Sequence, residues 1–122
     1  MKTFNRDTGR LAENLAAKHL QDKGYDIIEQ NFSNRFGEID IIAKDPSASS
    51  GPVLVFVEVK AKRGVDFGLP EEMVGKGKLQ KIRNMATVYN SGKEVPCRID
   101  VVAVILSPDN EIVRLTHYEN VY

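Results

Sequence analysis

The sequence contains one cysteine, no tryptophan, few aromatic residues (7%) and no long hydrophobic run. A single cysteine, Cys97, can form neither an internal disulfide nor a cysteine-cluster metal site. The longest apolar run, residues 101–106, has the length of a strand and falls far short of the roughly 18 residues of a membrane-spanning helix. Residues 1–10 lack the apolar core and the small-residue cleavage site of a secretory signal, so we expect a cytoplasmic protein.

A net charge of one sign is also missing, because 17 basic residues balance 17 acidic ones. This balance argues against strong, indiscriminate coating of DNA. The distribution is uneven, since residues 60–83 carry seven basic side chains and three acidic ones, and the remainder of the chain has the matching acidic excess. This basic segment is either a surface that meets phosphates locally or simply a solvated helix face.

The length and composition indicate one globular domain over residues 1–122, since 42% of the residues are hydrophobic and 28% are charged. Long disorder, collagen and coiled coil are excluded at this composition. Apolar residues recur at helical spacing in two segments, and short apolar stretches bounded by Gly, Pro and Ser indicate strands. We expect helices at residues 7–23 and 75–89, and strands or extended segments at 25–32, 36–43, 53–61, 99–106 and 112–117. This order predicts a mixed α/β fold on a sheet of about five strands.

Charged side chains interrupt the two strands expected at 36–43 and 53–61. Because side chains alternate along a strand, the first strand should have an apolar and a mainly acidic face, namely Ile39, Ile41 and Ala43 against Glu38, Asp40 and Ile42. The second strand is apolar on both faces until Glu58 and Lys60. We therefore expect it to be central in the sheet, with those two side chains partly shielded from water.

Joining these two strands as an antiparallel hairpin sets Asp40 opposite Glu58. The midpoint of the two positions is residue 49, in the centre of a polar loop. Directly opposed residues have Cβ atoms about 4.5–5.5 Å apart, and two partly desolvated carboxylates at that distance disfavour each other. The counter-charge is either Lys60, two residues along the same face, or a divalent cation such as Mg²⁺. A purely structural ion pair at the end of the sheet is the third reading.

Two helical residues add to this group. Glu13 borders the apolar arc of the first helix, since about 20° separate it from Leu20 at the ~100° per residue of an α-helix. Lys78 heads an apolar stripe of the second helix, so its ammonium either snorkels to water or points at the sheet. Convergence of titratable groups from separate elements is typical of a functional site. The candidate site residues are Glu13, Glu38, Asp40, Glu58, Lys60 and Lys78.

Asp40, followed after a hairpin by Glu58-Val59-Lys60, resembles the PD-(D/E)xK nuclease signature. Almost end to end, the chain resembles the bacterial YraN-type protein family, which is related in fold to archaeal Holliday-junction resolvases. The matching positions are Ala12-Glu13, Ala16, Leu20, Gly24-Tyr25, Asn31-Phe32, Gly37-Glu38-Ile39-Asp40, Phe56-Val57-Glu58-Val59-Lys60, Gly68, Pro70, Val74, Lys78 and Arg98-Ile99-Asp100-Val101-Val102. Glu-x-Lys alone is a weak signal, whereas GEID followed by FVEVK at this distance is specific.

This resemblance implies a restriction-endonuclease-like αβββαβ core and a metal-dependent endonuclease that acts on branched or structured DNA. It implies that Asp40, Glu58 and the carbonyl of Val59 hold Mg²⁺ or Mn²⁺. Lys60 would orient or help to deprotonate the attacking water, and Glu13 would assist from the helix, in support or as a ligand of a second metal. The basic residues that would contact the nucleic acid are Lys62, Arg63 and Lys78.

The chain departs from the family pattern around these basic residues. Ala61-Lys62-Arg63 stands where the family often has Thr followed by Arg, so either basic side chain could meet the backbone of the nucleic acid. Lys76 and Lys78 compete in the same way, and the helical face favours Lys78. Glu38 belongs to the matched motif without an assigned role. The resemblance also allows a homodimer, although no residue of the sequence demonstrates an interface.

Three functions stay open on the sequence. The protein is a metal-dependent nuclease, a nucleic-acid-binding module with little or no turnover inside a larger complex, or a protein whose acidic cluster is only structural. Asp100, a charge inside an apolar strand, either pairs with Arg98 on the same face or belongs to the site. His117 has only Glu119 near it in the sequence, too little for a metal site, and Cys97 lacks a local base, which argues against a catalytic thiol.

Overall fold

Five strands form a single sheet whose spatial order follows the chain, β1-β2-β3-β4-β5. The structure is a computed structural model that describes residues 6–47, 51–63 and 74–121. Its elements are α1 (Arg6–Asp22), β1 (Asp26–Asn34), β2 (Gly37–Asp45), β3 (Val53–Arg63), α3 (Lys76–Tyr89), β4 (Cys97–Leu106) and β5 (Ile112–Tyr118). Neighbouring strands are antiparallel except β3 and β4, which are parallel, so the sheet is mixed. The order of the elements confirms the predicted restriction-endonuclease-like αβββαβ core.

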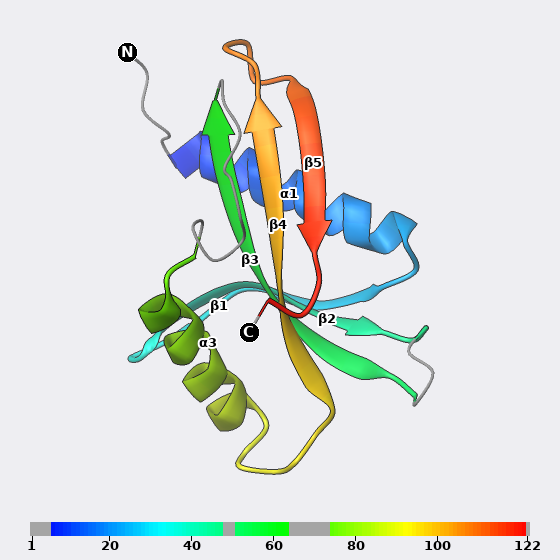
Figure 1. Ribbon diagram of the computed structural model, residues 1–122, viewed down its shortest axis with the longest axis vertical. Coiled ribbons are helices and arrows are strands. Elements are labelled where there is room, and N and C mark those ends of the chain that lie inside the picture. Colours follow the sequence, from blue (N-terminus) through cyan, green and yellow to red (C-terminus); the bar gives the residue numbers. More distant parts are fainter. Residues whose placement is uncertain (1–5, 48–50, 64–73, 122) are drawn as a thin grey trace.

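The two helices pack on opposite faces of the sheet, and the twist of the sheet turns the β1–β2 hairpin away from β4 and β5 (Figure 1). On the α1 face, Leu20 belongs to the same buried cluster as Val57. On the α3 face, Ile82 and Met85 belong to a second buried cluster with Phe56. β3 contributes to both clusters and lies in the middle of the sheet, as its two apolar faces predicted.

α1 ends at Asp22, just before Gly24, the predicted stop, which has a φ of +94°. The N–H of Gly24 donates to the carbonyl of Gln21, and the N–H of Tyr25 donates to the carbonyl of Leu20. This paired arrangement around a residue with positive φ satisfies the last carbonyls of the helix and turns the chain into β1. Neither described helix is long and apolar enough to cross a membrane.

The register of the central hairpin confirms the sequence prediction. Ile41 pairs with Val57, which places Asp40 beside Glu58. Residue 49, the predicted centre of the loop, lies outside the described residues, as do Gly68 and Pro70.

One predicted face was wrong. Ile41 and Ala43 belong to the cluster on the α1 face, whereas Ile39 belongs to the cluster on the α3 face. The reason is that β2 pairs with β3 only from Ile41 onward, while it stays paired with β1 as far as Gly37. The first residues of β2 therefore follow the twist of the β1–β2 hairpin rather than the plane of β3.

Candidate active site

Asp40 lies where the strands β2 and β3 separate. The β2–β3 ladder ends at the pair Ile41 and Val57. Two residues further along β3, the N–H of Val59 donates to the Asp40 carboxylate, with 2.8 Å between N and Oδ2. The Asp40 side chain thus satisfies a backbone donor that the ladder no longer reaches, and this bond fixes the carboxylate at the opening between the two strands.

Glu58 is the buried partner of Asp40, with only 5% of its surface exposed. Burial raises the pKa of Glu58, and the hydrogen bond and negative charge of Asp40 raise it further, whereas Lys78 and Lys60 lower it, for a resulting value of about 8. Two carboxyl groups that share a hydrogen bond need a proton or a cation between them. At neutral pH the pair therefore retains a proton unless another positive charge takes its place.

Lys78 and Lys60 both act on this pair, but not equally. The Nζ of Lys78 reaches across from the first turn of α3 to lie 3.4 Å from Oε2 of Glu58. Lys60, which alternation places on the same face of β3 as Glu58, has the smaller effect on the pKa of Glu58. The sequence offered Lys60 or a divalent cation as the counter-charge and left open whether Lys78 points at water or at the sheet. In the structure Lys78 points at the sheet and makes the direct ion pair with Glu58.

A cavity of about 380 Å³ opens on the α1 side of Asp40. Glu13 and Glu38 line it together with Asp40 and Val59, so the candidate residue from the first helix does approach the two strands. Glu13 is 8% exposed and accepts a long hydrogen bond of 3.4 Å from Nε2 of Gln30. Burial and the charges of Asp40 and Glu38 raise the pKa of Glu13. The opening is therefore rich in carboxylates on both faces of the sheet.

The residues at this opening fit a Mg²⁺ or Mn²⁺ ion with an incomplete protein shell. Within residues 6–47, 51–63 and 74–121, no three His, Cys, Asp or Glu side chains form a ready-made metal cluster. Mg²⁺ is commonly held by one or two carboxylates and completed by waters and substrate phosphates. The N–H and C=O of one strand residue point to the same edge of the strand. The carbonyl of Val59 therefore faces the Asp40 side, as its N–H does, and the donor set is Asp40, Glu58 and this carbonyl.

The other two residues predicted to contact the nucleic-acid backbone, Lys62 and Arg63, lie further along the chain from Asp40 and Glu58. Lys62 and Arg63 are the last two residues of β3, four and five positions beyond Glu58. The guanidinium of Arg63 is occupied within the protein, where Nη2 donates to Oγ1 of Thr8 at 3.5 Å and to Oδ1 of Asn110. The structure thus brings together Glu13, Glu38, Asp40, Glu58, Val59, Lys60 and Lys78, which we call the acidic site, and leaves Lys62 and Arg63 outside it.

Three residues that line the cavity were not among the predicted site residues, namely Gly9, Arg10 and Asn31. Arg10 lies three residues before Glu13 on α1, and its positive charge lowers the pKa of Glu13. Helical spacing could have identified it, because positions three apart share a face. Asn31 has a φ of +56°, a left-handed conformation inside a strand. It is among the positions that match the family, but that match assigned it no role.

A second buried ionic group surrounds Arg98 on the α1 face of the sheet. Its guanidinium donates from Nε to Asp100 at 3.0 Å, from Nη1 to Asp45 at 3.1 Å and from Nη2 to the hydroxyl of Tyr25 at 2.5 Å. Nε2 of His117 lies 2.7 Å from Oδ2 of Asp100. We call Arg98, Asp45, Asp100, Tyr25 and His117 the arginine cluster. Of the two predictions for Asp100, pairing with Arg98 is confirmed.

The role of His117 follows from its second nitrogen. Nζ of Lys23 lies 2.8 Å from Nδ1 of His117. A lysine ammonium can only donate, so Nδ1 accepts and the proton resides on Nε2, which donates to Asp100. The side chain of His117 is 3% exposed, which makes it a buried structural donor.

The comparisons with known proteins agree with the resemblance described above. The family model described as "Uncharacterised protein family UPF0102" matches residues 12–104. A UPF0102 protein from Dictyoglomus turgidum is 36% identical to this chain, over 97% of this chain and 98% of the relative. A UPF0102 protein from Syntrophus aciditrophicus is 46% identical, over 88% of this chain and 83% of the relative. A solved structure, that of Pyrococcus furiosus SfsA in complex with Ca²⁺, has a TM-score of 0.34 and 13% identity over 93% of this chain and 63% of that one, too remote a likeness for any conclusion.

Proposed function

The chain belongs to the YraN-type family UPF0102, and from this premise we propose that it is a metal-dependent endonuclease. It hydrolyses phosphodiester bonds, and its substrate is branched or structured DNA. One observation carries the proposal. At the opening between β2 and β3, the Asp40 carboxylate accepts the N–H of Val59 at 2.8 Å beside the buried Glu58, and Nζ of Lys78 from a third element lies 3.4 Å from Oε2 of Glu58.

Each residue of the acidic site has a role that its position supports. Asp40, Glu58 and the carbonyl of Val59 would hold Mg²⁺ or Mn²⁺. A metal bound there supplies an activated water and stabilises negative charge on the phosphoryl oxygens. Lys60, on the same face as Glu58, orients the attacking water or takes up its proton. Lys78, whose Nζ lies 3.4 Å from Oε2 of Glu58, would exchange this carboxylate for a phosphate oxygen of the substrate.

Glu13 acts from the α1 side of the opening. Its carboxyl faces the cavity with Asp40 and Glu38, at a distance where their charges raise its pKa. From there it supports the position of the metal-bound carboxylate or binds a second metal. Glu38 lines the same cavity, and we assign it no chemical step of its own.

The experiment is a cleavage assay on three labelled substrates of equal length, namely a four-way junction, a fork and a linear duplex, each with Mg²⁺ or Mn²⁺. Wild type should cleave a branched substrate, and Asp40→Asn, Glu58→Gln and Lys60→Ala should each lose the activity by about 100-fold or more. Glu29→Gln, which changes an exposed carboxyl of β1, is the matched control and should keep it. Unchanged cleavage in Asp40→Asn and Glu58→Gln would overturn the proposal.

The nucleic-acid-binding module remains the second candidate, and the composition of α3 favours it. The helix carries Lys76, Lys78, Lys81 and Arg83 and no acidic residue. Such a surface binds phosphates whether or not the acidic pair turns over substrate. Binding to a junction without metal that weakens steeply with salt, together with no cleavage under any condition, would support this function over the nuclease.

A homodimer is part of the same proposal, because two copies of the acidic site could act on two strands of one branched substrate. Sedimentation equilibrium with and without junction DNA measures it. A monomer in both conditions would remove the dimer and leave the assignment of the site intact.

A further inference from the structure

The turn between β1 and β2 presents an exposed aromatic ring to solvent. β1 ends at Asn34 and β2 begins at Gly37, so Arg35 and Phe36 form the tip of the hairpin. Phe36 is 51% exposed, and the other large hydrophobic side chains that are comparably exposed in the described part of the chain are aliphatic. Scattered aliphatic side chains are normal on a protein surface. A solitary ring at the end of a hairpin offers a flat face that can stack.

This tip is held in place by contacts within the turn and by the close approach of Gly37 to α3. The N–H of Phe36 donates to Oδ1 of Asn34 at 2.9 Å, and the Arg35 guanidinium lies 4.9 Å from the centre of the Phe36 ring. Gly37, the next residue, is so close to α3 that a Cβ there would lie 3.2 Å from Sδ of Met85. The ring is therefore presented on a supported turn, which lowers the entropy lost when it stacks on a partner.

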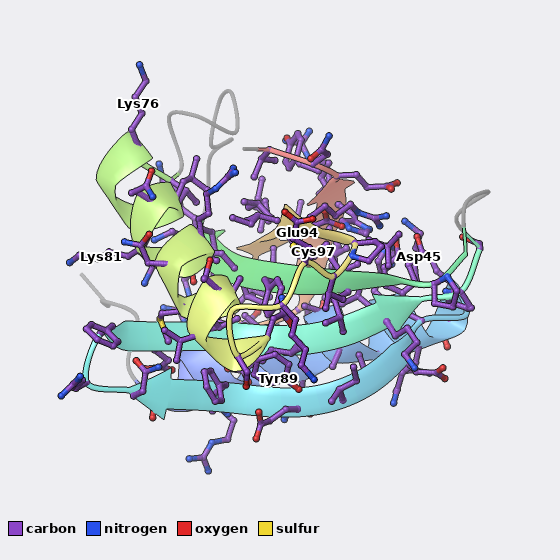
Figure 2. All side chains as sticks on the ribbon, turned by 90° about the horizontal axis from the view of Figure 1, so that it is seen from below. Asp45, Lys76, Lys81, Tyr89, Glu94 and Cys97 are labelled. Carbon is purple, nitrogen blue, oxygen red and sulfur yellow. The ribbon has the colours of Figure 1, made fainter. Side chains whose placement is uncertain are left out.

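The surroundings of the tip are positive. Arg35 is part of the turn itself, and Lys81 is exposed and lies one helical turn before Met85, the residue of α3 that Gly37 approaches. Figure 2 shows Lys76 and Lys81 pointing from α3 away from the sheet. An aromatic face flanked by cations is the combination with which proteins bind unpaired nucleotides, because the ring stacks on the base and the cations hold the backbone.

We propose that Phe36 stacks on an unpaired nucleobase of the substrate while Arg35 and Lys81 hold the adjacent phosphates. This inference rests on the proposed function and narrows its substrate to DNA with unstacked bases near the cut. Phe36 precedes Asp40 by four strand residues, or about 13 Å at about 3.3 Å per residue. That length places the stacked base within a few nucleotides of the scissile phosphate. A continuous duplex covers the faces of its bases, whereas a fork or junction exposes them.

The absence of tryptophan from the sequence allows a direct test. Phe36→Trp introduces a single fluorophore at the tip, and Val113→Trp places one at a 65% exposed position on β5 as the matched control. Titration with forked DNA in chelator, where no cleavage occurs, should quench Trp at position 36 in a saturable manner and leave Trp at position 113 unchanged. A duplex of the same length should quench neither.

Affinity provides the second readout. Phe36→Ala should weaken binding of the fork by about 5- to 150-fold, as loss of one stacked base predicts, and leave duplex binding unchanged. Val113→Ala is the control, and thermal melts of all variants show that each is folded. Equal affinities of wild type and Phe36→Ala for the fork, or no binding of the fork by wild type, would overturn the inference.

The two proposals fail in different ways. Cleavage that survives in Phe36→Ala with unchanged affinity would remove the stacking role and keep the nuclease. Quenching of Trp at position 36 without cleavage by wild type would remove the nuclease and keep the stacking surface. A change in sedimentation on Phe36→Ala without any change in DNA affinity would show that the ring packs against a second copy of the chain, which overturns the inference.

Discussion

The acidic site and the arginine cluster place carboxyl groups of similar burial on one sheet, yet the pKa values of these groups move in opposite directions. Burial is the largest influence on both Glu58 and Asp100, and in both it raises the pKa. At Asp100, hydrogen bonds from His117, Arg98 and the N–H of Asn120 more than compensate, and the pKa is lowered. At Glu58 the nearest neighbour is another carboxyl group, and the pKa rises to about 8.

Hydrogen-bond donors around a buried carboxylate therefore decide whether its pKa is lowered or raised in this protein. Asp45 behaves like Asp100, since hydrogen bonds from Ser47 and Arg98 outweigh the effect of its burial and lower its pKa to about 2. Asp45 also lies far from the first turn of α3, where Lys76 projects (Figure 2). Glu58 shares its surroundings with Asp40 and two lysines, Lys78 and Lys60. Because Glu13 and Glu38 lie at the same opening as Asp40, carboxyl groups outnumber these two lysines. That deficit of positive charge is what a divalent cation would fill.

The largest effect is expected from breaking the arginine cluster. Asp100→Asn replaces one acceptor oxygen with an amide NH₂ among four converging donor contacts, so a donor meets a donor in a fully buried position. Breaking a buried ion pair from one side costs about 3–5 kcal/mol. Urea unfolding measures this loss, with the exposed Asp26→Asn as control. A loss below about 1 kcal/mol would show that the cluster is not structural.

The next largest effect is expected from metal binding, which should stabilise the protein through the acidic site and not through the arginine cluster. Mn²⁺ at about 100 times its Kd stabilises a protein that binds it only when folded by about 2.7 kcal/mol. Wild type and Asp45→Asn should show this gain in a thermal melt, because the arginine cluster takes no metal. Glu58→Gln should show none. Equal gains in wild type and Glu58→Gln would place the metal elsewhere.

The acidic site and the arginine cluster should also change the free energy of unfolding in opposite directions as the pH rises. The pKa of Glu58 is raised from 4.5 to about 8 in the folded state, so this group favours folding below about pH 4.5 and its contribution is lost as the pH rises to about 8. The pKa of Asp45 is lowered from 3.8 to about 2, so its contribution is present above about pH 3.8 and is lost as the pH falls toward 2.

Melting temperatures from pH 2 to pH 9 measure both slopes. Glu58→Gln should flatten the decline between about pH 4.5 and 8, and Asp45→Asn should flatten the acid limb. If Glu58→Gln instead leaves the upper decline intact, Glu58 does not hold the proton of the acidic pair.

Local sequence rules predicted the parts of this comparison that depend on neighbours along the chain. The hairpin register followed from loop symmetry and alternation, and it brought Asp40 to Glu58. Pairing of Asp100 with Arg98 followed from their spacing of two in one strand. The end of α1 followed from Gly24, whose positive φ few other residues adopt.

Contacts that depend on tertiary packing could not be predicted from the sequence. Tyr25 and Arg98 are 73 residues apart, and His117 reaches Asp100 only because β5 pairs with β4 in one register. The ion pair of Lys78 with Glu58 depends on how α3 docks on the sheet, so the sequence could only leave open whether Lys78 points at water or at the sheet. Ile39 changed face because β2 leaves β3, a splay that alternation alone cannot express.

The smallest expected effect is also the most diagnostic. Above about pH 8, where Glu58 has lost its proton, Asp40→Asn removes one of two like charges, while the amide oxygen can still accept the N–H of Val59 and the NH₂ can donate to Glu58. Without metal, this variant should gain about 1 kcal/mol of unfolding free energy in urea. Asp45→Asn, the same chemical change in the arginine cluster, should lose stability because the one remaining oxygen can accept from Ser47 or from Arg98, and the NH₂ then faces the other donor. If both variants are destabilised, the two regions are alike, the acidic site is a structural ion network, and the case for metal at Asp40 falls with it.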